Sequence, residues 1–410
     1  MKDFAKLWAG QTVSEVCSRI TRDGLPLAAL LTLNASAAQM GVLSAISSAS
    51  VFVFGLGAGV LVDRLRKRPV MIATDLGRAG LLALIPLAAY KHVLSMAALM
   101  TVAALAGALT VLFDVAYQSY LPVLVEPGEL LESNQRLSLS SSVAEMLGPA
   151  MTGVLVQAIT APLAILVDAL SFLVSAFSVW AIRRSEDVPE RTHHAAFIGE
   201  ALDGMRFIWS HPALRSLLLR STTAFWFMGL IFPLYMLNAI RVVHLSTSAL
   251  GLTIALGGAG SLVGAFLAGR LSTRYGEGRV FFGTAVLIGC AQLFIPLSSE
   301  FPGIGFPCLC VQQFAGDMMW TIYAVNETSL RQFLAPGHVM GRVNAAMQLA
   351  SRGMLPFGAL AGGFFAERFG VAPALWVAAF GVLLSCLWLI PLAKGRETRM
   401  AQMRDDGSNE

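Results

Sequence analysis

The sequence has 410 residues, of which 56% are hydrophobic and 13% are charged, and its mean hydropathy is +0.68. Soluble globular proteins carry roughly one quarter charged residues, so this composition excludes an ordinary soluble domain and indicates an integral membrane protein. The net charge of +4 is spread over short polar segments between apolar runs. Such a distribution favours contact with anionic lipid headgroups over binding to nucleic acid.

Apolar runs long enough to cross a bilayer recur along the whole chain. A membrane-spanning helix needs about 20 apolar residues. By this measure the sequence predicts twelve spans, at residues 4–33, 38–61, 70–90, 94–121, 136–159, 162–182, 213–240, 248–269, 280–298, 303–328, 342–365 and 372–393. Because twelve is an even number, both termini are expected on the same side of the membrane.

The positive charges fix the expected orientation. About 21 Lys and Arg residues fall in the segments on one side, against three on the other: Lys91, Arg241 and Arg368. Basic residues are retained on the cytoplasmic side, so we expect a multi-pass protein of the cell membrane with both termini in the cytoplasm. The first apolar segment is too long and too charged for a cleavable signal peptide, and we expect the chain to insert by its own helices.

The first predicted helix carries four charged residues on one stripe. Glu15, Arg19, Arg22 and Asp23 have the spacing i, i+4, i+7 and i+8, which places them on one face of a helix with 3.6 residues per turn. Charges at this depth are costly and normally face a bundle interior or a water-filled cavity. We therefore expect them either to line a substrate cavity or to form the structural pairs Glu15–Arg19 and Arg19–Asp23.

A charged loop follows the second predicted helix and forms a candidate gating latch. Its members are Gly59, Asp63, Arg64, Lys67 and Arg68, with Asp114 of the fourth predicted helix expected nearby as a second acid. The glycine permits close helix approach, and an acid facing the positive end of a neighbouring helix can form an ion cluster in only one state of a transporter. The pattern Gly-x-Leu-x-Asp-Arg-x-x-basic-basic resembles the signature between helices 2 and 3 of the major facilitator superfamily.

The fifth predicted helix combines an acid with a glycine and a proline. Glu145 precedes Gly148 and Pro149, and the segment 148–153 is similar to part of the antiporter signature of proton-linked drug exporters in that superfamily. Proline removes a backbone hydrogen bond and permits a kink, whether for flexing or for purely structural reasons. Glu145 is the favoured proton carrier because no base lies within one turn of it, and Asp23 is the second candidate.

Three further blocks extend the resemblance over most of the first half. They are Phe113-Asp114-Val115-Ala116-Tyr117-Gln118-Ser119-Tyr120-Leu121-Pro122, Asp75-Leu76-Gly77-Arg78-Ala79 and Asp168-Ala169-Leu170-Ser171-Phe172. These blocks resemble the drug-efflux branch that includes the macrolide exporters and the enterobactin exporter. The resemblance implies a secondary active exporter.

A polar linker separates two halves that repeat each other at an offset of about 206 residues. Residues 1–186 and 213–393 are each expected to form a six-helix bundle, 187–212 a cytoplasmic linker with an amphipathic helix, and 394–410 a cytoplasmic tail. Pro149 aligns with Pro356, Glu145 with Arg352, and Asp63 with Gly269; Asp317 adds an acid near the middle of 303–328. The predicted fold class is an all-α integral membrane protein with twelve transmembrane helices in two pseudo-symmetric bundles, the major facilitator fold.

The expected function is transport without nucleotide hydrolysis, since the sequence contains no phosphate-binding loop of the form Gly-x4-Gly-Lys-Ser/Thr. We expect a proton-coupled exporter of an amphipathic small organic molecule, such as an antibiotic, a siderophore or a secondary metabolite, held in a largely apolar cavity. An uptake carrier of the same fold and a membrane scaffold or receptor are the alternatives. No catalytic arrangement indicates an enzyme, Cys308 and Cys310 alone do not make a metal site, and we expect a monomer without cofactors.

Overall fold

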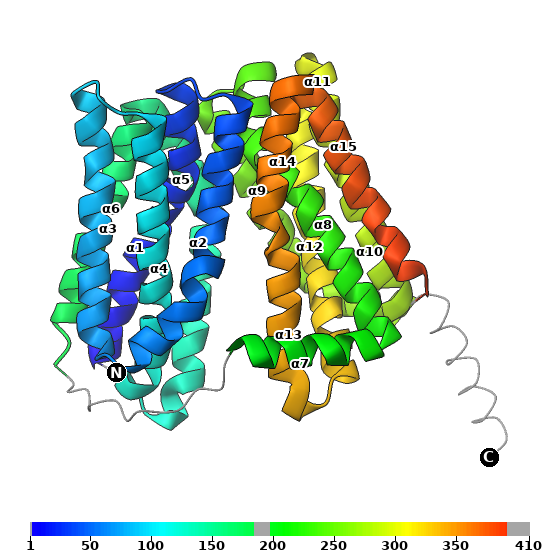
Figure 1. Cartoon of the computed structure of the whole chain (residues 1–410), viewed down its shortest axis with the longest axis horizontal. Coiled ribbons are helices and arrows are strands. Elements are labelled where there is room, and N and C mark those ends of the chain that lie inside the picture. The colour runs from blue at the N-terminus through cyan, green and yellow to red at the C-terminus, as the bar shows by residue number, and fades with distance from the viewer. Residues whose placement is uncertain (1, 184–196, 392–410) are drawn as a thin grey trace. The chain divides into compact units, whose positions relative to one another are not determined.

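The computed structural model describes residues 2–183 and 197–391, and within these two ranges all regular secondary structure is helical. The chain divides into two compact units. The first unit comprises Met1–His194 together with Ala239–Ala255, and the second comprises Ala195–Asn238 together with Leu256–Glu410. Figure 1 shows the helices of each unit running up and down as a bundle.

The first unit is built from six long helices, one short 3-10 turn and the segment Ala239–Ala255, which includes the start of α9 (Thr247–Tyr275). The six helices and the turn are α1 (Lys2–Leu31), α2 (Ala37–Asp63), α3 (Lys67–Tyr90), α4 (Met96–Leu124), η1 (Pro127–Glu129), α5 (Leu130–Ile159) and α6 (Ala161–Trp180). Two of the helix starts are capped by serine: Ser36 Oγ accepts from the Gln39 N–H of α2, and Ser95 Oγ accepts from the Ala98 N–H of α4. These bonds satisfy amide donors that have no partner within the helix.

Within the first unit, α1 packs against α5 and α6, α3 packs against α4 and α6, and α2 packs against α4. An apolar cluster including Phe4, Leu7, Phe113 and Tyr120 ties α1 to α4. This arrangement brings the inner faces of α1, α3, α4 and α5 together, and these four helices carry the candidate site described below.

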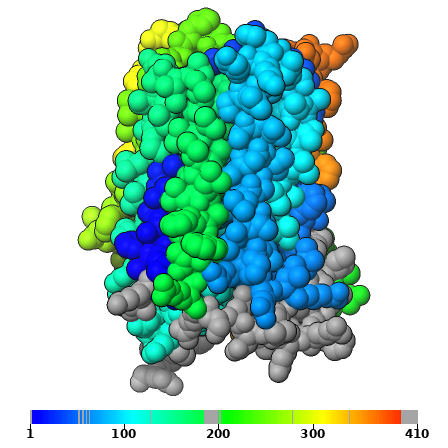
Figure 2. Space-filling view, turned by 90° about the vertical axis from the view of Figure 1, so that its left-hand side faces the viewer, coloured from blue at the N-terminus to red at the C-terminus, as the bar shows by residue number. Residues whose placement is uncertain are grey.

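The outer face of the first unit is apolar. Figure 2 shows α6 in green and α3 in light blue side by side along the height of this face. Large hydrocarbon side chains are exposed there, among them Leu84, Leu170 and Phe177, whereas Asp75 and Asp168 of the same two helices are completely buried. Apolar groups lie on the outside of this unit and charged groups lie inside it, which is the pattern expected of a protein surrounded by lipid.

The second unit contains the remaining helices. They are α7 (Phe197–Ser210), α8 (Pro212–Leu237), the larger part of α9 (Thr247–Tyr275), α10 (Glu277–Gln292), α11 (Phe294–Glu300), η3 (Pro302–Ile304), α12 (Gly305–Leu334), α13 (Gly337–Arg352), α14 (Met354–Phe369), α15 (Val371–Leu384) and η4 (Ser385–Leu389). A π-helical segment, η2 (Asn238–Val242), directly follows α8.

Small residues allow the helices of the second unit to approach closely. Gly229 of α8 meets Gly358 of α14, where an added Cβ at Gly358 would lie 3.0 Å from the Cα of Gly229. Gly204 of α7 rests on the backbone of Arg342, so that α7 packs along α13. Ile208 of α7 is buried while Trp209 is exposed, as expected of an amphipathic helix.

The two prolines expected to kink helices differ in effect. α5 continues without interruption through Pro149. By contrast, α13 ends at Arg352 and α14 begins at Met354, and Pro356 lacks the N–H that would have bonded to the carbonyl of Arg352. The break at Gly353 therefore has a direct cause in the sequence.

Among the described residues, eight helical segments are long and apolar enough to cross a membrane by length and composition: Lys67–Tyr90, Met96–Leu124, Leu130–Ile159, Ala161–Trp180, Pro212–Val242, Thr247–Tyr275, Gly278–Glu300 and Val371–Leu389. The all-helical, membrane-spanning fold class is confirmed. The count of twelve spans stays a prediction.

Candidate substrate site in the first unit

A cavity of about 760 Å³ opens between the inner faces of α1, α3, α4 and α5. Its walls are formed by Gln11, Ser14, Glu15, Ser18, Arg78, Thr110, Phe113, Asp114, Tyr117, Gln118, Leu121, Asn134, Leu137, Ser138, Ser141 and Ser142. Only three of these side chains are hydrocarbon. The other thirteen end in hydroxyl, amide or charged groups, and their hydrocarbon portions also line the cavity; a largely apolar cavity stays a prediction.

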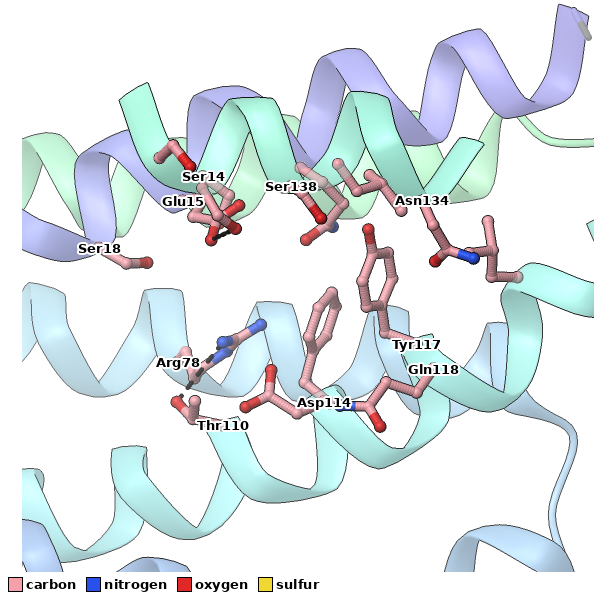
Figure 3. Close-up of a pocket in the computed structure, with 16 residues that line it drawn as sticks. Ser14, Glu15, Ser18, Arg78, Thr110, Asp114, Tyr117, Gln118, Asn134 and Ser138 are labelled. Carbon is pink, nitrogen blue, oxygen red and sulfur yellow. Dashed lines mark hydrogen bonds between the residues drawn. The ribbon is translucent and has the colours of Figure 1, made fainter. Parts of the chain in front are cut away.

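Two carboxylates face the cavity from opposite walls. Figure 3 shows Glu15 on α1 pointing toward the helix that carries Asp114, with Arg78 beside Asp114 and Thr110. The Ser141 hydroxyl of α5 donates a hydrogen bond to Glu15 Oε1. Tyr117 and Gln118 of α4 extend the same wall with a phenol and an amide. Such a cavity can hold a cation against two acids, can hydrogen-bond a polar molecule at several points and can contact an apolar portion of it.

A buried ionic cluster lies directly behind this cavity. The guanidinium of Arg78 forms an ion pair with Asp75 and lies 4.4 Å from the ring centroid of Phe113 and 4.1 Å from that of Phe172. The other carboxylate oxygen of Asp75 accepts from Ser175 Oγ at 2.7 Å. Both oxygens of Asp75 thus have donors, and Arg78 is held between two aromatic faces by cation–π attraction.

A second buried acid, Asp168 of α6, faces α1. Its Oδ1 accepts hydrogen bonds from Ser171 Oγ at 3.0 Å and from Ser18 Oγ at 3.4 Å. Its Oδ2 is buried without a hydrogen-bond partner. Because Ser18 also lines the cavity, one hydroxyl group separates the cavity from Asp168.

The four charged residues predicted to form one stripe on α1 have different surroundings in the structure. Glu15 lines the cavity, whereas Arg19 reaches α5 and pairs with Glu145 at 3.4 Å. Arg22 is exposed and Asp23 is half-buried, and neither contributes to the walls of this cavity. The cavity-lining face of α1 is instead offset by part of a turn and consists of Gln11, Ser14, Glu15 and Ser18.

The glycine and proline of α5 serve close packing. An added Cβ at Gly148 would lie 2.5 Å from the Cβ of Arg19, so the glycine admits α1 at the level of the Arg19–Glu145 pair. One turn further, Gly153 meets the backbone of Thr247 and Gly251 at the start of α9, and Gly251 in turn approaches the carbonyl of Pro149. Gly148 and Pro149 therefore lie where α5 meets its neighbours.

Only part of the candidate latch lies among the described residues. Gly59 and Asp63 belong to α2, but the side chain of Asp63 lies outside the described residues. Arg64 is exposed, and Lys67 is half-buried at the start of α3. Arg68 donates to the carbonyls of Val179 and Trp180 at 3.1 and 2.5 Å, which satisfies the last turn of α6.

Asp114, expected as the second acid of the latch, lines the cavity. It lies ten residues before the end of α4, in the cavity wall beside Arg78. At a rise of about 1.5 Å per residue this is roughly 15 Å from the helix end. A role of Asp114 in the latch stays a prediction, and its place in the cavity wall adds a second possible role.

In the second unit the candidate residues are more scattered. Asp317 of α12 is half-buried against Gly257 of α9, and Arg352 is exposed at the last position of α13. Sequence reasoning missed Arg220 of α8, which is buried with its guanidinium 3.9 Å from the ring centroid of Tyr323. Its Nε and Nη2 atoms have no hydrogen-bond partner.

Sequence reasoning also gave no role to Asp75, Arg78 and Asp168, which it used only as marks of resemblance. The signal was present, because each is an ionisable residue inside an otherwise apolar run, and such residues are rarely there without a function. In the part of the chain that the structure describes, no group of three or more His, Cys, Asp or Glu residues is placed to hold a metal ion.

A bundle of membrane-crossing helices with buried ionic groups around a polar cavity is the architecture of a membrane transporter. The sequence matches the family described as transmembrane secretion effectors over residues 1–405, and the chain belongs to this family of the major facilitator superfamily. It is a multi-pass membrane transporter and not an enzyme.

Relatives of the chain include named efflux proteins. Macrolide efflux protein A of Streptococcus pyogenes is 25% identical over 398 residues, covering 94% of each chain. The multidrug efflux pump Tap of Mycolicibacterium fortuitum is 25% identical over 386 residues, covering 91% of each. These similarities extend over nearly the whole length of all three proteins.

Solved structures share the fold. A bacterial homologue of the iron transporter ferroportin, in an inward-facing state, superimposes with a TM-score of 0.75 at 17% identity, covering 96% of this chain and 98% of that one. The nucleoside transporter NupG gives a TM-score of 0.74 at 10% identity, covering 95% of this chain and 98% of that one. At these identities the comparison establishes the fold alone.

Proposed function

We propose that the protein is a proton-coupled exporter of amphipathic small organic molecules and that the cavity of the first unit holds the substrate. The observation that carries this proposal is the pair of carboxylates, Glu15 and Asp114, facing each other across a space of about 760 Å³ with polar walls. A volume of this order suits a drug-sized ligand.

The chemistry of the walls favours a particular kind of substrate. Two acids favour a ligand with a positive charge, and the serine, asparagine and glutamine side chains favour one with several hydroxyl or carbonyl groups. Tyr117 and Phe113 supply aromatic surface for an apolar portion. An antibiotic or secondary metabolite that combines an amine with a polar skeleton fits these requirements, and a macrolide is one such molecule.

Export rather than uptake is supported by the efflux proteins among the relatives. Proton coupling is supported by the number of carboxyl groups in and behind the cavity, since a proton antiporter needs an acid that changes its protonation state during the cycle. Both termini are proposed to lie in the cytoplasm, on the side to which the Lys and Arg residues of the loops are biased.

The loop between α2 and α3 is proposed to act as a gate. Asp63, Arg64, Lys67 and Arg68 follow the superfamily signature, and Arg68 already connects this loop to the end of α6. An acid in such a loop can hold one state closed and release it in another.

The proposal is tested by accumulation of a compound panel that includes macrolides, cationic dyes and siderophores in cells with and without the protein. We expect at least one amine-bearing compound to accumulate less in protein-bearing cells, and a protonophore to abolish the difference. If the protein-bearing cells instead accumulate more of a compound, the carrier works in uptake. Equal accumulation of every compound would contradict the proposal.

A further inference from the structure

The ionic cluster behind the cavity contains more acids than bases. Asp75, Arg78 and Asp168 are exposed to 0%, 5% and 0%. Arg78 is committed to Asp75 by an ion pair, and Ser175 donates to the second oxygen of that carboxylate. Asp75 therefore has the partners that an ionised carboxylate requires, and the charge of Arg78 is already matched.

Asp168 has no cation of its own. The groups that face it are the hydroxyls of Ser18 and Thr21 and the thiol of Cys17 from α1, Arg78 from α3, and Ser171 on its own helix. Only Arg78 among these is charged, and it is paired elsewhere. A second ionised carboxylate here would be a buried charge whose only donors are neutral hydroxyl groups, and it would have no cation of its own, which is costly in a membrane interior.

We propose that Asp168 is a proton-binding site, reached from the cavity through the hydroxyl of Ser18. Binding forms an O–H bond at the carboxyl group, the proton comes from water in the cavity, and release returns it there, so the step needs no other reactant. A proton on this fully buried carboxyl group would remove the electrostatic cost of a second ionised acid beside Asp75.

This assignment deepens the proposed function, on which it rests, by giving the coupling proton a place. A cationic substrate beside Asp114 and the proton on Asp168 are both positive charges near Arg78, so each disfavours the other, which is the competition that antiport requires. Glu145, the carrier favoured from the sequence, is 65% exposed and paired with Arg19, so it lacks the burial that ties protonation to a conformational state.

The test is infrared spectroscopy of the purified full-length protein in lipid, titrated from acidic to alkaline buffer without substrate. We expect a carbonyl stretching band of a buried protonated carboxyl group that shifts in deuterium oxide and disappears on alkaline titration. The band should be lost in Asp168→Asn and retained in Glu132→Gln, a control that removes an exposed acid paired with Arg136 on α5. A band unchanged in Asp168→Asn overturns the proposal, as does its absence from the parent protein.

Three further variants keep the test decisive. Asp75→Asn leaves Arg78 free to neutralise Asp168, so the band should titrate at lower pH. An unshifted titration would contradict the statement that Asp75 takes up the charge of Arg78. Ser18→Ala should lose the rapid response of the band to deuterium oxide. If Asp168→Asn does not fold, Asp168→Glu retains the acid and should move the band; an identical band refutes the assignment. The infrared band is recorded without any transport. A protein that shows the band but moves no compound would therefore contradict the proposed export function and leave the proton site on Asp168 standing.

Discussion

The two units place different chemistry at corresponding positions of the internal repeat. At the offset of about 206 residues, Tyr323 corresponds to Tyr117 and Trp320 corresponds to Asp114. In the first unit Tyr117 and Asp114 line an open polar cavity. In the second unit Trp320 and Tyr323 lie over the guanidinium of Arg220, at 5.9 and 3.9 Å from their ring centroids to its central carbon.

A duplicated fold therefore need not carry the same binding site in both halves. The first unit keeps two acids at the cavity and two behind it, and Arg78 pairs with one of these four, Asp75. At the equivalent positions of the second unit, one buried cation is covered by aromatic rings. We infer that charge-based recognition and proton binding reside in the first unit, while the aromatic group of the second unit is chiefly structural.

The largest effect that separates the units is expected at their buried arginines. Arg78→Met leaves Asp75 without its cation, and removing one partner of a buried pair costs about 3–5 kcal/mol. Thermal unfolding of the purified variant should show a large loss of stability, and the double variant Arg78→Met, Asp75→Asn should recover part of it. A single variant as stable as the parent would show that the ion pair does not stabilise the packing of α3.

The gate loop offers a second comparison, because Asp63 of the first unit corresponds to Gly269 of the second. We expect Asp63→Asn to reduce transport strongly with normal amounts of folded protein in the membrane. Gly269→Asp is the matched control, since no atom lies within 4 Å of a Cβ added there and folding should be unaffected. Should Asp63→Asn transport as well as the parent, the loop sets only the topology of the chain.

Ligand binding should distinguish the acids of the two units. Asp114→Asn removes a charge from the cavity wall, and the loss of a charge-assisted contact worth about 1.4 kcal/mol weakens binding about tenfold. Binding of the organic cation tetraphenylphosphonium to the purified protein measures this directly. Asp317→Asn in α12 should change the affinity much less. Equal losses in the two variants would place the second unit in the binding site as well.

The smallest effect is expected from Arg220→Met. Its Nε and Nη2 lack hydrogen-bond partners, so the substitution loses the contact with Tyr323 and the electrostatic attraction of Glu327, and it relieves the burial of a charge. We expect stability to change by no more than about 1–2 kcal/mol, a contact of this kind being worth roughly that much. A loss of stability as large as that of Arg78→Met would show that Arg220, like Arg78, is stabilised by an ionic partner.

Much of the helical framework could be predicted from the sequence. The apolar runs 70–90 and 162–182 became α3 (Lys67–Tyr90) and α6 (Ala161–Trp180), because apolar length alone sets where a chain crosses lipid. Helix ends were less well predicted: the span expected at 94–121 is the helix α4, Met96–Leu124, which continues through Pro122.

The site was predictable only in part. Helical spacing identified a charged stripe on α1, but periodicity does not reveal the neighbouring helix. For Arg19 the sequence left open a cavity-lining role or a partner on α1, and the structure pairs it with Glu145 on α5. The pairing of Arg78 with Asp75 and the position of Asp168 depend on how α1, α3 and α6 pack. Such tertiary contacts are not encoded in the spacing of any one segment.

The central claim, that acids at and behind the first unit's cavity carry substrate-linked proton antiport, is tested most directly in inverted membrane vesicles. The measurement is accumulation of a compound that protein-bearing cells exclude, driven by an imposed proton gradient, for the parent and for the double variant Glu15→Gln, Asp114→Asn. We predict accumulation by the parent that a protonophore abolishes, and none by the folded double variant. Gradient-driven accumulation by the double variant equal to that of the parent would contradict the account.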